Sequence, residues 1–240
     1  MLTLDGVTAG WTAEVPVLTG VRLRVAPGEV VGLTGPSGGG KSTLARVAAL
    51  LLAPQAGRVA VDDVPVTGVR YAVPPALRGS VGMVFQSPRR SVDPRLRLAD
   101  VIAEPLRVPG TATAGRRRAG ARDARVAELA DRVGLTGDLL RRRPQEVSDG
   151  QLQRACLARA LAQRPRYLVC DEMTAMLDAS TAAALVSLVR AEAHAGRLGV
   201  LAVSHDDDLL AAWADRVADV RAWSARPQPQ VPVPGDDRRS

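Results

Sequence analysis

The strongest constraint on this chain is one short run that contains its only lysine. Lys41 is the single lysine among 32 lysine and arginine residues. The run fits the pattern Gly-x-x-x-x-Gly-Lys-Ser/Thr and consists of Gly35, Pro36, Ser37, Gly38, Gly39, Gly40, Lys41, Ser42 and Thr43. Lysine is a compact charge on a flexible stem, whereas arginine is a wide planar fork, so a narrow phosphate site accepts lysine and excludes arginine. The run therefore predicts a phosphate-binding loop, with a Gly-rich turn into a helix as the alternative.

The residues around this run support the first interpretation. An apolar stretch at residues 30–33 precedes it, which is the strand-then-helix context that the motif requires. Glycines let backbone amides point at phosphates, and a helix starting near Lys41 adds the positive end of its dipole. Ser42 is placed to ligate Mg²⁺, and Thr43 to hydrogen-bond a phosphate. The segment predicts a site for β- and γ-phosphates with Mg²⁺.

The pattern along the chain predicts an α/β fold with a parallel sheet. Strand-like stretches are expected at residues 2–7, 21–25, 29–33, 57–61, 64–67, 81–85, 166–170, 198–204 and 216–222. Helices are expected at residues 42–52, 99–106, 119–133, 151–163, 180–195 and 207–214. Strands alternating with helices imply parallel pairing. Residues 88–161 form a helical insertion in a domain of residues 1–225, and residues 226–240 are expected to be a disordered tail.

Composition narrows the possible partners. The formal charge is +7 and the isoelectric point about 10.7, which would suit nucleic acid or an anionic surface. Aromatic residues are only 2%, however, and base stacking needs them, so we expect no nucleic-acid partner. No apolar run approaches the roughly 20 residues of a membrane span, and the first residues do not resemble a signal peptide. Cys156 and Cys170 have no metal-ligand spacing and are expected to be buried thiols.

Two carboxylates follow the apolar stretch at residues 166–170. The C-terminal ends of parallel strands are where ligands bind, so Asp171 is placed to hold Mg²⁺ and Glu172 to polarise a water for attack on a γ-phosphate. The alternative is a pair of acids that caps a turn. His205 follows the next strand, where it can reach the γ-phosphate. The sequence thus predicts catalytic and metal-binding groups behind the phosphate loop.

Two further segments carry candidate residues. Gln86 ends a strand and begins the helical insertion, so it can contact the metal or the attacking water. Ser148 precedes a predicted helix, and its hydroxyl and the Gly150 amide can bind a phosphate at that helix N-terminus. An ordinary helix cap is the alternative for Ser148.

These residues together resemble the ATP-binding subunits of ABC transporters. Lys41 and its loop, Gln86, Ser148 to Gln151, Asp171 with Glu172, Asp178 and His205 occur in that family's order. The resemblance covers about residues 2–222. It implies a P-loop NTPase with a parallel-sheet core, an N-terminal antiparallel β subdomain and an inserted helical subdomain.

The family also implies how ATP is bound. Two such domains enclose two ATP molecules, each between one chain's phosphate loop and Ser148, Gly150 and Gln151 of the other. Trp11 matches the aromatic residue that stacks on adenine, although an exposed tryptophan at a strand edge is the alternative. Asp178 matches the residue that crosses the dimer interface.

A narrower resemblance points to importers of dipeptides, oligopeptides and nickel. Residues 85–95 and Glu104-Pro105-Leu106 are similar to that group. It implies two different ATPase subunits, this chain being the second, at the cytoplasmic face of the membrane with permease subunits and an external solute-binding protein. The chain departs from the pattern at Asp149, where glycine is usual, and at Met173 and Ala175, where proline and serine are usual. Soluble ABC ATPases of DNA repair or translation and a non-hydrolysing partner subunit are the alternatives.

Overall fold

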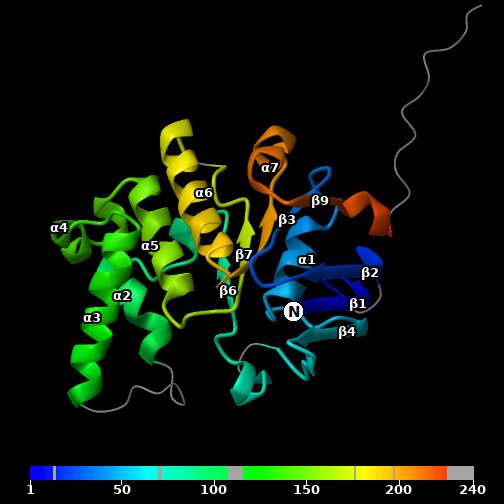
Figure 1. Ribbon diagram of the computed structural model, residues 1–240, viewed down its shortest axis with the longest axis horizontal. Helices are drawn as coiled ribbons and strands as arrows, with labels where there is room; N and C mark the ends of the chain where they lie inside the picture. The colour runs from blue at the N-terminus through cyan, green and yellow to red at the C-terminus, as the bar shows by residue number, and fades with distance from the viewer. Residues whose placement is uncertain (13–14, 70–71, 108–115, 176, 197, 226–240) are drawn as a thin grey trace, which may run out of the picture.

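A five-stranded parallel sheet forms the centre of the molecule (Figure 1). The computed structural model describes residues 1–12, 15–69, 72–107, 116–175, 177–196 and 198–225. The sheet has the order β6-β7-β8-β3-β9, and its members are β3 (Val30–Thr34), β6 (Val81–Val84), β7 (Tyr167–Asp171), β8 (Gly199–Val203) and β9 (Arg216–Asp219). Every strand pairing in it is parallel. The C-terminal ends of the strands therefore share one edge, as predicted.

A four-stranded antiparallel sheet forms the second layer. It comprises β1 (Leu2–Ala9), β2 (Leu18–Val25), β4 (Ala56–Val61) and β5 (Val64–Pro65), in the order β2-β1-β4-β5. Helix α1 (Lys41–Ala48) lies between the two sheets (Figure 1) and buries its apolar side chains in a core shared by both. This arrangement confirms the predicted fold class and fixes the start of α1 against the ends of the parallel strands.

Helices cover the other face of the parallel sheet. Between β6 and β7 the chain forms α2 (Leu98–Ala103), α3 (Arg116–Arg132), α4 (Gly137–Arg141) and α5 (Asp149–Leu161), which gather at one side in Figure 1. Short 3₁₀ helices, η3 (Pro88–Arg90), η4 (Glu104–Arg107) and η5 (Pro144–Glu146), connect them. Helix α6 (Ala179–His194) follows β7, and helix α7 (Asp207–Trp213) follows β8. The helices α2 to α7 pack together in a second hydrophobic core.

Several predicted boundaries are wrong. Helix α1 ends at Ala48 rather than at residue 52, because Leu50 adopts a left-handed backbone conformation with φ of 60°. Strand β9 stops at Asp219, whose side chain accepts a hydrogen bond from the Arg221 amide at 2.8 Å and begins a 3₁₀ helix, η6 (Val220–Trp223). Helix α4 was not predicted at all. The predicted tail, residues 226–240, lies outside the described residues.

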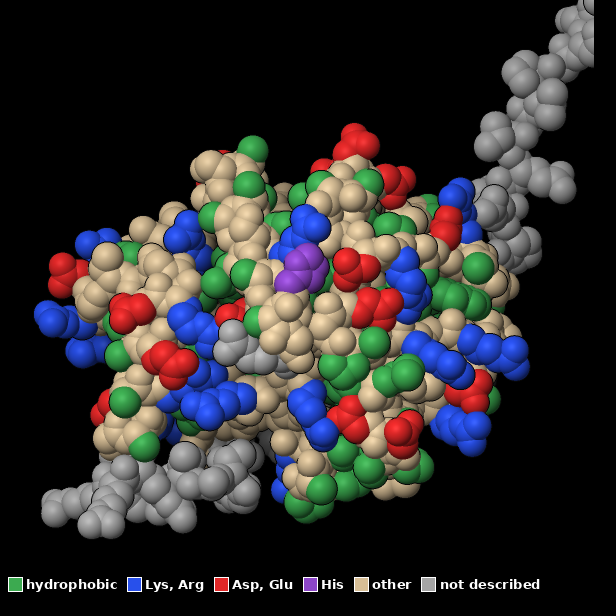
Figure 2. Space-filling model, viewed as in Figure 1, with side chains coloured by type: hydrophobic (Ala, Val, Ile, Leu, Met, Phe, Trp, Pro, Cys, Tyr) green, Lys and Arg blue, Asp and Glu red, His purple; other side chains and the backbone are tan. Residues whose placement is uncertain are grey.

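The surface carries both signs of charge. On the face shown in Figure 2, basic side chains are interspersed with aspartate and glutamate. Several opposite charges of the described residues form ion pairs, as Arg58 does with Asp5 at 2.9 Å. None of the helices in the described ranges is long and apolar enough to cross a membrane. Cys156 and Cys170 are free and buried, as predicted, and burial raises the pKa of both thiols.

Candidate active site

The loop that contains Lys41 joins the end of β3 to the start of α1. Two of its glycines are required by space and by backbone conformation. A Cβ on Gly35 (φ 133°) would lie 2.6 Å from Val220 Cγ1, and one on Gly40 (φ 100°) would lie 2.8 Å from Leu18 Cδ2. Helix α1 begins without a side-chain cap and without an acidic residue in its first turn. Its first amides are therefore left to bind an anion.

Lys41 lies inside the curl of this loop. The residue is 5% exposed, and its Nζ donates hydrogen bonds to the carbonyl oxygens of Gly35 at 2.7 Å and Pro36 at 3.1 Å. Thr43 is also buried. The ammonium group is thus enclosed by backbone at the N-terminus of α1, where phosphate oxygens can compete for it.

Ser42 and Asp171 form a pair of oxygen donors beside the loop. Ser42 Oγ donates a hydrogen bond to Asp171 Oδ1 at 3.1 Å, and Asp171 is buried. Burial raises the pKa of Asp171, and the hydrogen bond from Ser42 partly offsets this. A hydroxyl and a carboxylate oxygen suit Mg²⁺, whose remaining ligands are usually water and phosphate. Among the described residues no three His, Cys, Asp or Glu side chains form a group that could hold a metal ion.

Three candidate catalytic side chains follow the adjacent strands β6, β7 and β8. Gln86 Nε2 donates a hydrogen bond to Glu172 Oε2 at 2.7 Å, and His205 Nδ1 lies 3.6 Å from Glu172 Oε1. Glu172 has a positive φ of 48°, an uncommon conformation for a residue with a side chain. Its amide donates to the Val203 carbonyl at 3.0 Å, which ties this backbone to the end of β8. The arrangement presents one carboxylate between an amide and an imidazole.

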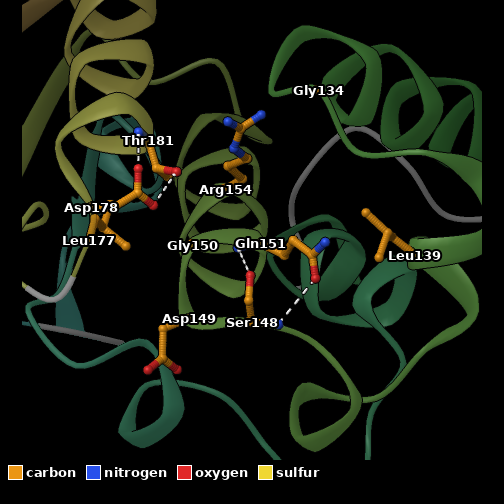
Figure 3. A pocket seen from close by; sticks show the side chains of 10 residues that line it. All are labelled: Gly134, Leu139, Ser148, Asp149, Gly150, Gln151, Arg154, Leu177, Asp178 and Thr181. Carbon is orange, nitrogen blue, oxygen red and sulfur yellow. Dashed lines mark hydrogen bonds between the residues drawn. The ribbon is translucent and has the colours of Figure 1, made fainter.

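The N-terminus of α5 lines a separate cavity of about 490 Å³ (Figure 3). The Gln151 amide donates to Ser148 Oγ at 3.2 Å, and the Ser148 amide donates to Gln151 Oε1 at 3.1 Å. The Ser148 hydroxyl proton is left to bind a phosphate. Asp178 lies across the cavity and caps α6 by accepting from Thr181. Hydrogen bonds from Ser180 and Thr181 lower the pKa of Asp178.

The cavity and the Lys41 loop are formed by different residues of the chain. The residues that line the cavity are Gly134, Leu139, Ser148, Asp149, Gly150, Gln151, Arg154, Leu177, Asp178 and Thr181. None of the loop residues 35–43 is among them. The structure therefore brings Ser148, Gly150, Gln151 and Asp178 together, but away from Lys41, Asp171 and Glu172.

Asp149 is paired with an arginine that the sequence analysis did not single out. Its side chain turns away from Ser148 and Thr181 in Figure 3, and Asp149 Oδ1 lies 2.7 Å from Arg89 Nε. Arg89 also donates to the carbonyl oxygens of Pro144 at 2.8 Å and Val147 at 3.1 Å. One guanidinium therefore neutralises the unusual acid and holds the segment that leads into α5.

The pairing of Arg89 with Asp149 predicts different effects for variants of the two residues. Asp149→Gly should change the ATP turnover of the assembled protein by less than about tenfold, because the carboxylate turns away from Ser148, the expected phosphate ligand, and already pairs with Arg89. Arg89→Ala should lower turnover more, because it leaves Asp149 unpaired beside an anion site, and Asp149→Gly in that background should restore part of the loss. Steady-state ATP hydrolysis by the four proteins measures this. A large activation by Asp149→Gly alone would contradict the assignment.

Trp11 follows β1 and is 60% exposed. The guanidinium carbon of Arg46, on α1, lies 4.8 Å from the centre of its ring. The tryptophan is therefore held near the helix that begins at Lys41, while most of its surface remains open to a stacking partner.

Comparisons with known proteins agree with this geometry. Residues 18–175 match the family profile described as ABC transporter. Methionine import ATP-binding protein MetN 2 of Pseudomonas aeruginosa is 40% identical over 205 residues, which are 85% of this chain and 59% of that protein. A putative peptide import ATP-binding protein of Brucella abortus is 40% identical over 199 residues, which are 82% of this chain and 58% of that protein. The chain thus spans under two thirds of the length of these relatives.

A solved structure is similar to this chain in its fold. It is the dimeric structure of an ATP-binding cassette in a post-hydrolysis state, bound to ADP and Pi. The match has a TM-score of 0.78 and 28% identity, and it covers 91% of this chain and 94% of that chain.

Proposed function

This chain belongs to the ABC transporter ATPase family, and we propose that it is the ATP-binding and ATP-hydrolysing subunit of an importer. The observation that carries hydrolysis is the Glu172 carboxylate, held by Gln86 at 2.7 Å and facing His205 at 3.6 Å. A non-hydrolysing partner subunit would have no need for a carboxylate placed in this way. The Lys41 loop beside it supplies the phosphate site.

The proposed reaction is attack of water on the γ-phosphorus of ATP. Glu172 accepts a proton from the water, whose oxygen forms a bond to phosphorus as the bond to the bridging oxygen of ADP breaks. Lys41 and the first amides of α1 stabilise the charge on the phosphates. Gln86 orients Glu172 and the water, and His205 donates a hydrogen bond to the γ-phosphate. Ser42 and Asp171 would hold Mg²⁺, which neutralises phosphate charge when bound.

The separation of the cavity at Ser148 from the Lys41 loop supports a dimer with ATP at its interface. Lys41 is not among the residues that line this cavity, so in this proposal one ATP contacts both Lys41 and Ser148 because a second ATPase subunit contributes one of them. In this proposal Ser148, Gly150 and Gln151 bind the ATP of the facing subunit, and Asp178 lies at the interface. Trp11 stacks on the adenine. The facing subunit is either a second copy of this chain or a related ATPase.

The proposed partners are transmembrane permease subunits and, through them, an extracytoplasmic solute-binding protein. The chain would then lie at the cytoplasmic face of the membrane as a peripheral subunit. The substrate class we propose is a small solute such as a peptide, because one relative is named for peptide import and another for methionine import. Nickel, suggested by residues 85–95, remains a prediction from the sequence alone.

The importer assignment predicts coupling between hydrolysis and the membrane subunits. ATP hydrolysis by the purified chain should be slow and should rise at least about tenfold in vesicles that contain its permease subunits. The segment after Gln86, which includes η3, is the proposed docking surface, and its ordering would set the position of Gln86. Phosphate release with and without permeases measures this, with Glu172→Gln in the same vesicles as the control. Equal rates in the two preparations would contradict an importer subunit.

A further inference from the structure

A buried glutamine lies beneath the catalytic residues and has no part in the reaction as described above. Gln153 is on α5 and is 1% exposed. It occupies a position on the buried side of the helix, with Cys156 and Leu157 one turn further on, where an apolar residue is the ordinary choice. A polar side chain at such a position needs a specific reason.

The amide of Gln153 joins the two backbone segments that carry the catalytic pair. Gln153 Nε2 donates to the carbonyl oxygen of Phe85 at 3.1 Å and to that of Met173 at 3.0 Å. Phe85 immediately precedes Gln86, and Met173 immediately follows Glu172. The Gln153 side-chain nitrogen therefore binds the backbone next to Gln86 and the backbone next to Glu172, the two residues whose side chains are 2.7 Å apart.

The hydrogen-bonding capacity of this amide fits that task. A glutamine amide has two N–H donors, and the two carbonyl oxygens use both, which fixes the orientation of the amide. Its other atom, Oε1, is buried and has no hydrogen-bond partner within the described ranges. An unpaired buried acceptor is unfavourable, and an apolar side chain of this size would avoid it but would leave the carbonyl oxygens of Phe85 and Met173 without this donor. The specific contribution of a glutamine at this position is therefore its two N–H donors.

The backbone at Glu172 is the part that most needs this support. Glu172 has a φ of 48°, and such conformations persist only where the surroundings hold them. The Met173 carbonyl, which Gln153 binds, is one residue away. We infer that Gln153 is a positioning residue that sets the separation of Gln86 and Glu172. This inference rests on the proposed function, in which that pair orients the attacking water.

The test compares two glutamines under the same substitution. Gln153→Met keeps a flexible side chain of similar size and removes both donors. Gln163→Met is the matched control, because Gln163 Nε2 also donates to a backbone carbonyl, that of Pro105 at 2.6 Å, and no catalytic residue is attached to it. Gln153→Met should lower kcat at least about tenfold with KM for ATP within about twofold, whereas Gln163→Met should keep both within about twofold. Equal losses of kcat in the two variants would overturn the inference.

A second measurement does not depend on turnover. In a crystal structure of the Gln153→Met protein, Gln86 Nε2 should lie beyond hydrogen-bond distance from Glu172 Oε2. An unchanged contact would overturn the inference even if kcat fell. Failure of the proposed function looks different: wild-type protein would bind ATP with Mg²⁺ but release no phosphate under any condition, while the effect of Gln153→Met on the Gln86–Glu172 separation could still be measured.

Discussion

Replacement of Lys41 by alanine is expected to abolish ATP hydrolysis, and replacement by arginine is expected to do nearly the same. The ammonium group is enclosed by the loop and bonded to the carbonyl oxygens of Gly35 and Pro36 at 2.7 and 3.1 Å. Alanine removes the charge that is proposed to bind the phosphates. Arginine keeps the charge, but its wide planar head does not fit a buried space shaped for an ammonium. We expect kcat/KM to fall at least about 100-fold in both variants, a loss of about 2.7 kcal/mol in transition-state stabilisation.

Phosphate release by the purified proteins, together with binding of a fluorescent ATP analogue, measures this effect. The matched control is Arg22→Lys, which exchanges the same two residue types at an exposed side chain of β2 and should leave both readouts unchanged. Near-normal turnover by Lys41→Arg would show that the loop does not select an ammonium group, and the assignment of the phosphate site would then be wrong.

Replacement of Glu172 by glutamine is expected to separate ATP binding from hydrolysis. The glutamine has the same shape, and its side-chain oxygen can still accept the hydrogen bond from Gln86 that measures 2.7 Å in the native protein. It cannot accept a proton from water. We expect kcat to fall about 100- to 1,000-fold, with affinity for ATP within about threefold of the native value. Because the bound ATP is not consumed, a dimer closed around it should accumulate.

Size-exclusion chromatography with ATP and Mg²⁺ detects that dimer, alone and with the second ATPase subunit if there is one. Glu128→Gln is the control, because Glu128 lies on α3, pairs with Arg125 at 2.6 Å and is not one of the candidate site residues. It should hydrolyse ATP normally and form no stable dimer. Normal hydrolysis by Glu172→Gln, or a protein that stays monomeric even with its natural partner, would contradict the role given to this carboxylate.

The parts of the fold that were predicted from the sequence are those with a local sequence pattern. Strands β3, β7 and β8 are short apolar runs that end at Thr34, Asp171 and Val203. The Lys41 loop follows β3, Glu172 follows β7 directly, and His205 lies two residues after β8. Parallel strands place their C-terminal ends at one edge, so the proximity of Ser42 to Asp171 and of Glu172 to His205 could be expected before the structure was known.

The parts that were missed depend on contacts between distant segments. Arg89 and Asp149 are 60 positions apart in a chain where arginine occurs in many places, so nothing local marks this pair. Gln153 did leave a signal, a polar residue at an apolar position of α5, but its two acceptors become visible only when the ends of β6 and β7 are in place. The left-handed conformation of Leu50, which ends α1 early, uses a leucine where glycine would have marked the turn.

The measurement that tests the central claim most directly is release of inorganic phosphate from ATP by the purified chain in the presence of Mg²⁺. The account predicts slow release by the native protein that requires Mg²⁺ and ATP, and no release above background by Lys41→Ala or by Glu172→Gln, although Glu172→Gln still binds ATP. Release that continues at the native rate in Glu172→Gln, or a native protein that binds no ATP, would contradict it.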